Sequence, residues 1–280
     1  MSGETSSGAG NGAAGGARES AITSLDLLWG TGERPSRGPK PGLTLDRIVG
    51  AAVALADAEG LDAVSMRRVS AELGVGTMSL YRYVPGKTEL LDLMLDRVQG
   101  ESLAGEPAAP PARQPGGWRT AIELLARGHL ALYRAHPWLL KVNEARSLLG
   151  PNTLRGFELC LAGLTGPHPY GMGLSDPETL SVIVTVQSFV TGVARLEIQT
   201  AEAAKETGFS DEEFWATQAP FLERAMKSGE FPTVAGLAED TFAVESDHFA
   251  FGLERLMEGF EALVARRAGG PGVSSGGTAS

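Results

Sequence analysis

LTLDRIVGAAVALADAEGLDAVSMRRVSAELGVGTMSLYRYVPGKTELLDLML, the segment from Leu43 to Leu95, contains short helical periods separated by glycine stops. The first predicted helix begins after Thr44, its N-cap, and ends at Gly60, because apolar residues recur on one face between them. Ser65 caps a second, shorter helix, which ends at Gly74. The segment is therefore expected to fold as helices joined by tight turns.

A third short helix is predicted from about Thr77 to Tyr83, where Pro85 and Gly86 stop it. The apolar spacing that follows predicts a fourth helix from Lys87 to about Gly100. Two short helices joined by a glycine-containing turn, after a supporting helix, form a helix-turn-helix, whose second helix enters a DNA major groove about 12 Å wide. Residues 43–100 are therefore predicted to be a DNA-binding domain.

The residues of this segment resemble the N-terminal domain of the TetR family of bacterial transcription factors. The pieces that carry the resemblance are Ala51-Ala52, Glu59-Gly60, Ser65 with Arg67, Leu73-Gly74-Val75, and Leu80-Tyr81 followed by Lys87. Farther along, FAFGLERLMEGFEALVARR, Phe249 to Arg267, is similar to the last helix of members with a tetracycline-repressor-like C-terminal domain.

The resemblance implies an all-α fold, with a three-helix helix-turn-helix domain followed by a larger helical domain that binds a ligand and dimerises. It also implies a regulator of transcription that binds double-stranded operator DNA. We expect a repressor that a small apolar or aromatic effector releases from a palindromic operator. The alternative is a dimeric helical adaptor or ligand-binding protein that does not bind an operator.

By the same resemblance, the segment from Thr77 to Tyr83 is the recognition helix. Its base-reading and groove-lining candidates are Thr77, Met78, Ser79 and Arg82. The Arg82 guanidinium suits bidentate pairing with guanine. The candidates for contacts to phosphate, and in one case to a base, are Tyr81, Tyr83, Lys87, Ser65 and Arg67. Two alternatives stay open, because Tyr81 could serve only to pack the core and Ser65 only to cap its helix.

A net charge of −10 argues at first against a nucleic-acid partner, but the charges are unevenly distributed. Between Arg34 and Thr88, eight Lys and Arg residues stand against five Asp and Glu residues. Arg34, Arg37 and Lys40 lie in a proline-rich segment that cannot form a helix, so they suit an arm in the adjacent minor groove. A merely solubilising tail is the alternative.

Domain limits are predicted from composition. Residues 1–42 are expected to be a disordered or extended basic arm, since residues 1 to about 20 offer almost no large apolar side chain. Leu25–Trp29 form a short apolar patch, and the sequence does not show where this patch packs. The Pro, Ala and Gly-rich segment 101–117 is a predicted linker, residues 118–268 an effector-binding and dimerisation domain, and residues 269–280 a disordered tail.

Helical periods continue through the C-terminal domain. The predicted helices are Trp118–Ala135, Trp138 to about Leu149, Pro151–Leu164, Pro177–Thr207, a helix from Ser210 that Pro220 restarts, and Phe249–Arg267. Ser175–Glu178 and Ser210–Glu213 match helix-capping patterns. The segment SVIVTVQSFVTGV has strand propensity, but helix is preferred because no second alternating segment exists to pair with it.

An effector cavity and a dimer interface are expected in this domain. Side chains suited to wall an apolar cavity are Trp118, Trp138, Phe157, Cys160, Phe189, Trp215 and Phe221. Polar side chains suited to orient a ligand are His129, Asn143, Gln187 and Glu197. The resemblance implies a homodimer through the 177–207 and 249–267 helices. Ordinary core packing is the alternative for all of these side chains.

Several classes of protein are excluded or disfavoured. The single cysteine, Cys160, cannot form an internal disulfide, and the N-terminus does not read as a signal peptide, so a cytoplasmic protein is expected. Leu180–Ala194 is shorter than a membrane span and is interrupted by Gln187 and Ser188, so no membrane partner is predicted. The four histidines lack a metal-binding spacing and Cys160 has no neighbouring base, so no enzyme, metal or cofactor is predicted.

Overall fold

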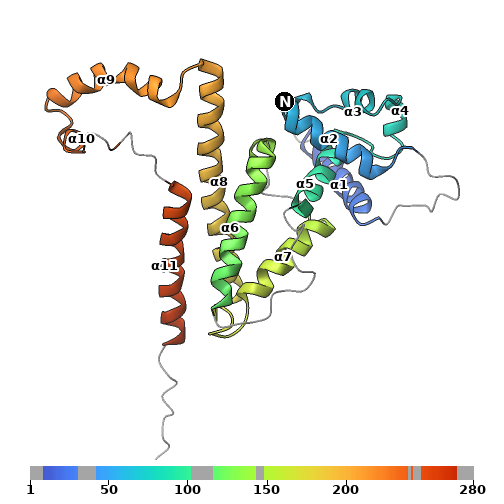
Figure 1. Ribbon diagram of the computed structural model, residues 1–280. Coiled ribbons are helices and arrows are strands. Elements are labelled where there is room, and N and C mark those ends of the chain that lie inside the picture. Colours follow the sequence, from blue (N-terminus) through green and yellow to red (C-terminus); the bar gives the residue numbers. More distant parts are fainter. Residues whose placement is uncertain are drawn as a thin grey trace, which may run out of the picture.

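The computed structural model describes residues 9–30, 42–101, 116–142, 148–238, 241 and 247–269. Every regular element in these ranges is a helix, which confirms the predicted all-α class (Figure 1). The segment SVIVTVQSFVTGV lies inside one long helix, as preferred on the absence of a pairing partner. The predicted arm residues Arg37 and Lys40, the effector candidate Asn143, and most of the linker lie outside the described residues.

Four helices form the domain that the sequence predicts to bind DNA, called the DNA-reading unit below. They are α2 (Leu45–Glu59), α3 (Met66–Glu72), α4 (Thr77–Leu80) and α5 (Lys87–Glu101), with the short 3-10 turn η1 (Leu61–Ala63) between α2 and α3. The predicted N-cap is confirmed, because the Thr44 hydroxyl accepts a hydrogen bond from the Arg47 N–H at 3.2 Å. Fully buried side chains from all four helices make the small core: Ile48, Ala52, Val69, Leu80, Leu90 and Met94.

Helix α1 (Ala9–Leu28) corrects the prediction of disorder for residues 1 to about 20, which is wrong for residues 9–20. The helix packs along α5, where its Leu27 and Leu28 reach the core. Its Ser24 hydroxyl, fully buried, donates a hydrogen bond to Asp92 Oδ2 at 2.6 Å. Tertiary contact therefore stabilises a helix whose own composition predicted none.

The apolar patch whose docking place the sequence left open lies at the end of α1. Trp29 Nε1 donates a hydrogen bond at 3.2 Å to the carbonyl of Leu149, which belongs to the C-terminal domain. Under α1, burial raises the pKa of Asp92, the Ser24 hydrogen bond opposes this rise, and the nearby Glu89 charge adds to it. Helix α1 thus covers two carboxylates of α5 and contacts both halves of the chain.

The C-terminal domain comprises α6 (Gly117–Ala135), the 3-10 helix η2 (Pro137–Lys141), α7 (Pro151–Leu164), α8 (Asp176–Thr207), α9 (Asp211–Lys227), α10 (Pro232–Ala235) and α11 (His248–Ala268). Helix α6 packs on α7 and α8, while α11 lies along α8 (Figure 1). The helices α9 and α10 extend away from this group.

Two predicted elements in this domain are wrong. The helix predicted from Trp138 to about Leu149 is wrong for its described residues, because residues up to Lys141 form the 3-10 helix η2 and residues 148–150 are not helical. Pro137 keeps His136 out of the α region (φ −128°, ψ 70°), which separates α6 from η2. Pro220 does not restart a helix but lies inside continuous α9, on an exposed side where water can bond the carbonyl that the proline ring frees.

Helix α8 is long and apolar enough to cross a membrane by length and composition alone. In this fold it packs between α6 and α11, with Val186 and Val190 fully buried against its neighbours. Its start carries the predicted capping box between Ser175 and Glu178. The hydrogen bonds from Ser175 hold the pKa of Glu178 at about 2, and Arg267 of α11 pairs with the same carboxylate. Helix α8 is therefore packed against two neighbouring helices and fixed at its start by Ser175 and Arg267.

Asp96 of α5 joins the two domains. Its carboxylate is 5% exposed and accepts hydrogen bonds from the Thr153 N–H and hydroxyl, both at 2.9 Å, and from the Asn152 N–H at 3.3 Å. These amides belong to the first turn of α7, whose N-cap, Gly150, has no side chain to offer them. A Cβ at Gly150 would collide with the carboxylate, so only glycine permits this approach.

Replacing Asp96 with alanine leaves two partly buried α7 amides and the Thr153 hydroxyl without their acceptor. We expect the free energy of unfolding to fall by about 2 kcal/mol, within the usual range for unpaired buried donors. Urea unfolding followed by circular dichroism measures this. Asp62→Ala, which removes an exposed carboxylate from η1, is the control and should change stability by less than about 0.5 kcal/mol. Equal effects of the two substitutions would show that Asp96 does not join the domains.

Candidate functional site

A tight turn presents α4 to solvent at one end of the molecule. After α3, the Gly74 N–H donates to the Ala71 carbonyl at 3.1 Å and the Val75 N–H donates to the Ser70 carbonyl at 3.0 Å, a Schellman motif. Gly74 has φ +66°, a left-handed conformation that favours glycine. The Ser70 and Thr77 hydroxyls then meet at 2.9 Å and bind the two helices together.

The outward face of this turn and of α4 carries several of the predicted DNA-contact residues. Met78 is 77% exposed and Tyr81 is 44% exposed, while Leu80 between them is fully buried. Arg82 is also exposed, and Ser79 is half-buried. Because buried Leu80 fastens the helix to the core, the backbone on either side of it is held so that Met78 and Tyr81 face outward.

Helix α4 is shorter than the predicted Thr77–Tyr83 helix. It ends at Leu80, and the Tyr83 and Val84 N–H groups both donate to the Leu80 carbonyl, at 2.8 and 2.9 Å. Tyr83 is half-buried and packs on the core. The recognition element is therefore one helical turn followed by a tight loop.

Ser65 and Lys87 flank this element. The Ser65 hydroxyl accepts a hydrogen bond from the Arg68 N–H at 3.2 Å, so it caps α3 as predicted. The Arg68 guanidinium lies 2.6 Å from a Glu59 carboxylate oxygen, whereas Arg67 and Lys87 are exposed, Lys87 as the first residue of α5. The helix N-terminus beside Lys87 adds a favourable environment for an anion such as phosphate.

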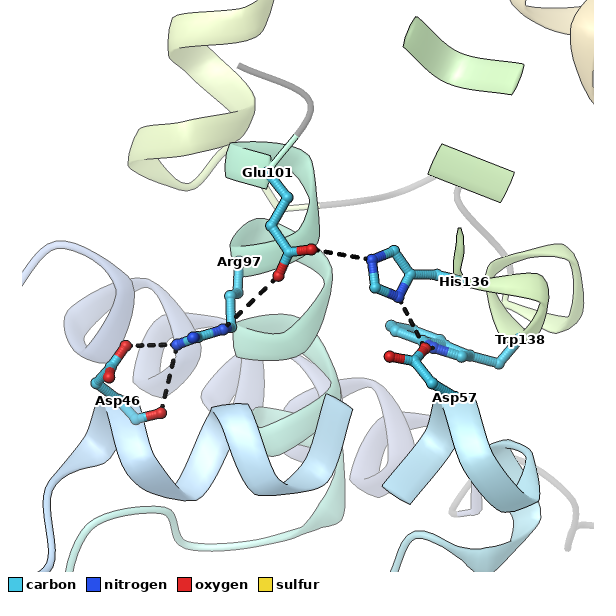
Figure 2. Close-up of polar contacts among 6 residues, drawn as sticks. All are labelled: Asp46, Asp57, Arg97, Glu101, His136 and Trp138. Atoms are coloured by element: carbon cyan, nitrogen blue, oxygen red, sulfur yellow. Dashed lines mark hydrogen bonds and ion pairs between the residues drawn. The ribbon is translucent and has the colours of Figure 1, made fainter. Parts of the chain in front are cut away.

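A polar junction joins the DNA-reading unit to the C-terminal domain (Figure 2). Asp57 Oδ1 of α2 accepts hydrogen bonds from Trp138 Nε1 and faces His136 Nδ1, each at 2.7 Å. The other ring nitrogen of His136 lies 3.1 Å from Glu101 Oε2 at the end of α5. Trp138, predicted to wall an effector cavity, is buried at this junction.

Sequence reasoning missed Asp57, Glu101 and His136 as a group. Asp57 and His136 are 79 residues apart in the chain, and no local pattern brings them together. Pro137 is the one available signal, since it predicts a break next to His136.

A second polar group lies between α6 and α8. His129 Nδ1 donates to the Leu125 carbonyl at 3.0 Å, so its Nε2 faces the Gln187 amide nitrogen, at 3.3 Å, as an acceptor. Burial lowers the pKa of His129, which favours this neutral form. One turn farther along, the Tyr133 hydroxyl lies 3.1 Å from the Thr191 hydroxyl. Two of the predicted effector residues, His129 and Gln187, are therefore in direct contact.

The remaining aromatic candidates are dispersed. Phe189 stacks on Phe249 of α11, with ring centroids 6.1 Å apart, and Phe157 is partly buried in the core. Trp215 lies on α9, where it is 42% exposed and meets Phe214 edge to face. The structure thus brings together His129 and Gln187, places Phe189 farther along α8, and places Trp138 and Trp215 elsewhere.

Within the described ranges, no three His, Cys, Asp or Glu side chains form a group that could hold a metal ion. Cys160, on α7, is partly buried against the core, and burial raises the pKa of its thiol to about 11. A thiol with this pKa is a poor nucleophile near neutral pH.

Both parts of the chain are similar to known protein families. Residues 48–94 match the family described as bacterial regulatory proteins, tetR family, and residues 110–264 match the tetracyclin repressor-like C-terminal domain. The HTH-type transcriptional repressor DrrR1 of Streptomyces coeruleorubidus is 57% identical over 246 residues, which cover 88% of this chain and 87% of that protein.

Among solved structures, the Streptomyces coelicolor TetR family protein ActR has a similar fold. The crystal structure of ActR in complex with actinorhodin has a TM-score of 0.59 and 33% sequence identity, over 80% of this chain and 99% of ActR. The complex with (S)-DNPA has a TM-score of 0.58 and 32% identity over the same shares of the two chains.

We expect Cys160 to resist alkylation in the folded protein. With a pKa of about 11, its thiolate fraction at pH 8 is about one thousandth, so iodoacetamide should react roughly a hundredfold more slowly than with the unfolded chain. Mass spectrometry of samples quenched over time, with and without guanidinium, measures both rates. Similar rates in the two samples would contradict the burial of this thiol.

Proposed function

The chain belongs to the TetR family of bacterial transcriptional regulators, and on that premise we propose that it is a repressor which a small molecule releases from its operator. As a family member it is a DNA-binding regulator of transcription. Repression is proposed because the relative DrrR1 is named a transcriptional repressor. The exposed face of α4 and its following loop, fastened by buried Leu80, is the observation that carries the proposal.

In the proposed complex, α4 enters the major groove. Arg82 pairs with a guanine, Met78 and Ser79 line the groove, and Thr77 supports the turn through its contact with Ser70. The phosphate contacts come from Tyr81, Tyr83, Lys87, Ser65 and Arg67, and the arm residues Arg37 and Lys40 reach an adjacent minor groove.

Specific binding requires two copies of this interface, held roughly 34 to 36 Å apart on a palindromic site. Dimers are typical of the family, and the α8 and α11 helices are the proposed contact. Both expose large apolar side chains that a second protomer would cover, Val184 and Leu196 on α8 and Phe251 on α11. Family members are typically soluble cytoplasmic proteins, and we propose the same compartment here.

The proposed effector site lies between α6 and α8. His129 and Gln187 offer a neutral imidazole and a carboxamide, polar groups of the kind that orient a ligand inside an apolar pocket. Phe157 and Phe189 are the proposed apolar wall, whereas Trp138 and Trp215 lie away from it. Asn143 stays a candidate to orient the ligand. ActR, a relative of similar fold, has been crystallised with two small molecules, actinorhodin and (S)-DNPA.

Helix α5 is the proposed route between the two sites. Lys87 begins it beside the DNA-contact face, and Asp96 bonds it to α7 of the effector domain. A ligand that shifts α7 relative to α5 would therefore move both reading units of a dimer. Couplings of about 1 to 3 kcal/mol, which are typical, would lower operator affinity 5- to 150-fold.

Selection of bound duplexes from a random pool, at fixed salt, tests operator binding and should recover a palindrome. On that duplex we expect the Arg82→Ala, Lys87→Ala double variant to bind at least about tenfold more weakly, with a shallower salt dependence. The control Arg224→Ala, Lys227→Ala removes the same charges from exposed α9 and should bind normally. Recovery of no duplex by a folded dimer would favour the adaptor alternative.

Gln187→Ala tests the effector site, with actinorhodin as the first compound to try because it binds ActR. We expect release of the operator to require roughly tenfold more compound than in the unmodified protein, while operator affinity without it stays unchanged. Gln199→Ala, an exposed glutamine on the same helix, is the matched control and should respond normally. Equal responses of both variants would exclude Gln187 from the site.

A further inference from the structure

The two domains meet around one buried histidine. His136 is 5% exposed, and its ring lies between Asp57 of α2 and Glu101 of α5, with its nitrogens 2.7 and 3.1 Å from their carboxylate oxygens (Figure 2). Because α2 and α5 belong to the DNA-reading unit and His136 belongs to the C-terminal domain, both contacts cross the junction.

The two contacts determine how many N–H groups the His136 ring must have. An ionised carboxylate only accepts hydrogen bonds, so each contact requires an N–H on the histidine side. A neutral imidazole has one N–H, whereas an imidazolium has two. The side chains of Asp57 and Glu101 are 31% and 49% exposed, so water reaches both carboxylates.

We propose that His136 is a positioning residue, held as an imidazolium clamp between Asp57 and Glu101, and that loss of its charge weakens operator binding as pH rises. The inference rests on the proposed operator binding but assigns a proton-dependent element that the effector site does not require.

The surrounding charges support an imidazolium. Arg97 of α5 pairs with Asp46 at the start of α2 and lies 3.9 Å from Glu101, so charges alternate along the line Asp46, Arg97, Glu101, His136 and Asp57 (Figure 2). Helices α6 and α8 also pack near η2, but none of their described side chains forms an ion pair with His136. The groups that face the ring are thus two carboxylates and the neutral Trp138.

Loss of the proton should open one contact rather than both. Asp57 Oδ1 is the nearer acceptor and is also held by Trp138 Nε1, so a neutral ring keeps its proton on Nδ1. The lone pair on Nε2 then faces the Glu101 carboxylate, and two acceptors at 3.1 Å repel each other. The end of α5 is therefore the part that is released.

Release of the end of α5 removes one of the contacts that hold the reading unit on the C-terminal domain. A dimer must present both units at a set spacing, so added orientational freedom has to be lost again when DNA binds. An imidazole ordinarily changes charge between pH 5 and 8, with the charged form at the lower end. Operator affinity is accordingly expected to be highest at the acid end of this range and to fall as pH rises.

Anisotropy of a fluorescent duplex recovered from the random pool measures affinity between pH 6 and pH 8 at constant salt. We expect the unmodified protein to bind about tenfold more weakly at pH 8, the loss typical of one charge-assisted hydrogen bond. His136→Gln should show an almost constant affinity. His168→Gln removes an exposed histidine and should keep the full pH dependence.

Glu101→Gln distinguishes an effect of the His136 proton from an effect of packing at this position. A glutamine amide can donate to the unprotonated Nε2, so the contact survives at high pH, and this variant should bind more tightly than the unmodified protein at pH 8. A constant affinity in the unmodified protein, or an unchanged pH dependence in His136→Gln, would overturn the clamp.

Nitrogen NMR of the free protein, labelled in its four histidines, provides a readout without DNA. The His136 ring, identified by its absence in His136→Gln, should carry two N–H protons at pH 6 and one at high pH. A ring with one proton at pH 6 would reject the clamp even if operator binding is confirmed. If the His136 ring carries two N–H protons at pH 6 but the random pool yields no bound duplex, the clamp is retained and operator binding is rejected.

Discussion

Helix α5 is bonded to both halves of the molecule, and the arrangement of the other helices depends on this. Leu90 and Met94 bury its apolar side against the DNA-reading unit, while Asp96 caps the first turn of α7 in the C-terminal domain. The Asp96 carboxylate is nearly inaccessible to water, so it requires hydrogen-bond donors from the protein, and the first-turn amides of α7 require an acceptor. The two domains therefore cannot separate at this point without leaving buried polar groups unpaired.

The acidic net charge of the chain is compatible with DNA binding because several acidic groups of the reading unit are engaged within the protein. Glu59 pairs with Arg68, Asp46 pairs with Arg97, and Asp92 lies under α1 with a serine hydroxyl as its partner. Arg67 of α3, Arg82 after α4 and Lys87 at the start of α5 stay exposed. These cations are available to phosphate, whereas Glu59, Asp46 and Asp92 are occupied within the protein.

Local signals in the sequence were enough to predict most helices. Thr44, Ser65 and the Ser210 capping box start helices where predicted, because a cap depends only on residues within one turn. The prediction failed where distant contacts decide the structure. Helix α1 is stabilised by α5, and Trp138 is drawn to Asp57, 81 residues earlier in the chain. The effector candidates His129 and Gln187 meet only because α6 and α8 pack side by side, which no periodicity specifies.

Helix α1 lies outside the segments that match the two families, yet the Ser20 and Ser24 hydroxyls donate to Glu89 and Asp92. Chimeric biosensors are commonly assembled by joining the DNA-reading segment of one regulator to the sensing domain of another. A chimera cut at the family limits would uncover the side of α5 against which α1 packs, and would remove the hydroxyl partners of both carboxylates. Residues 9–30 therefore belong with the DNA-reading unit, and a chimera that transfers this unit should include them.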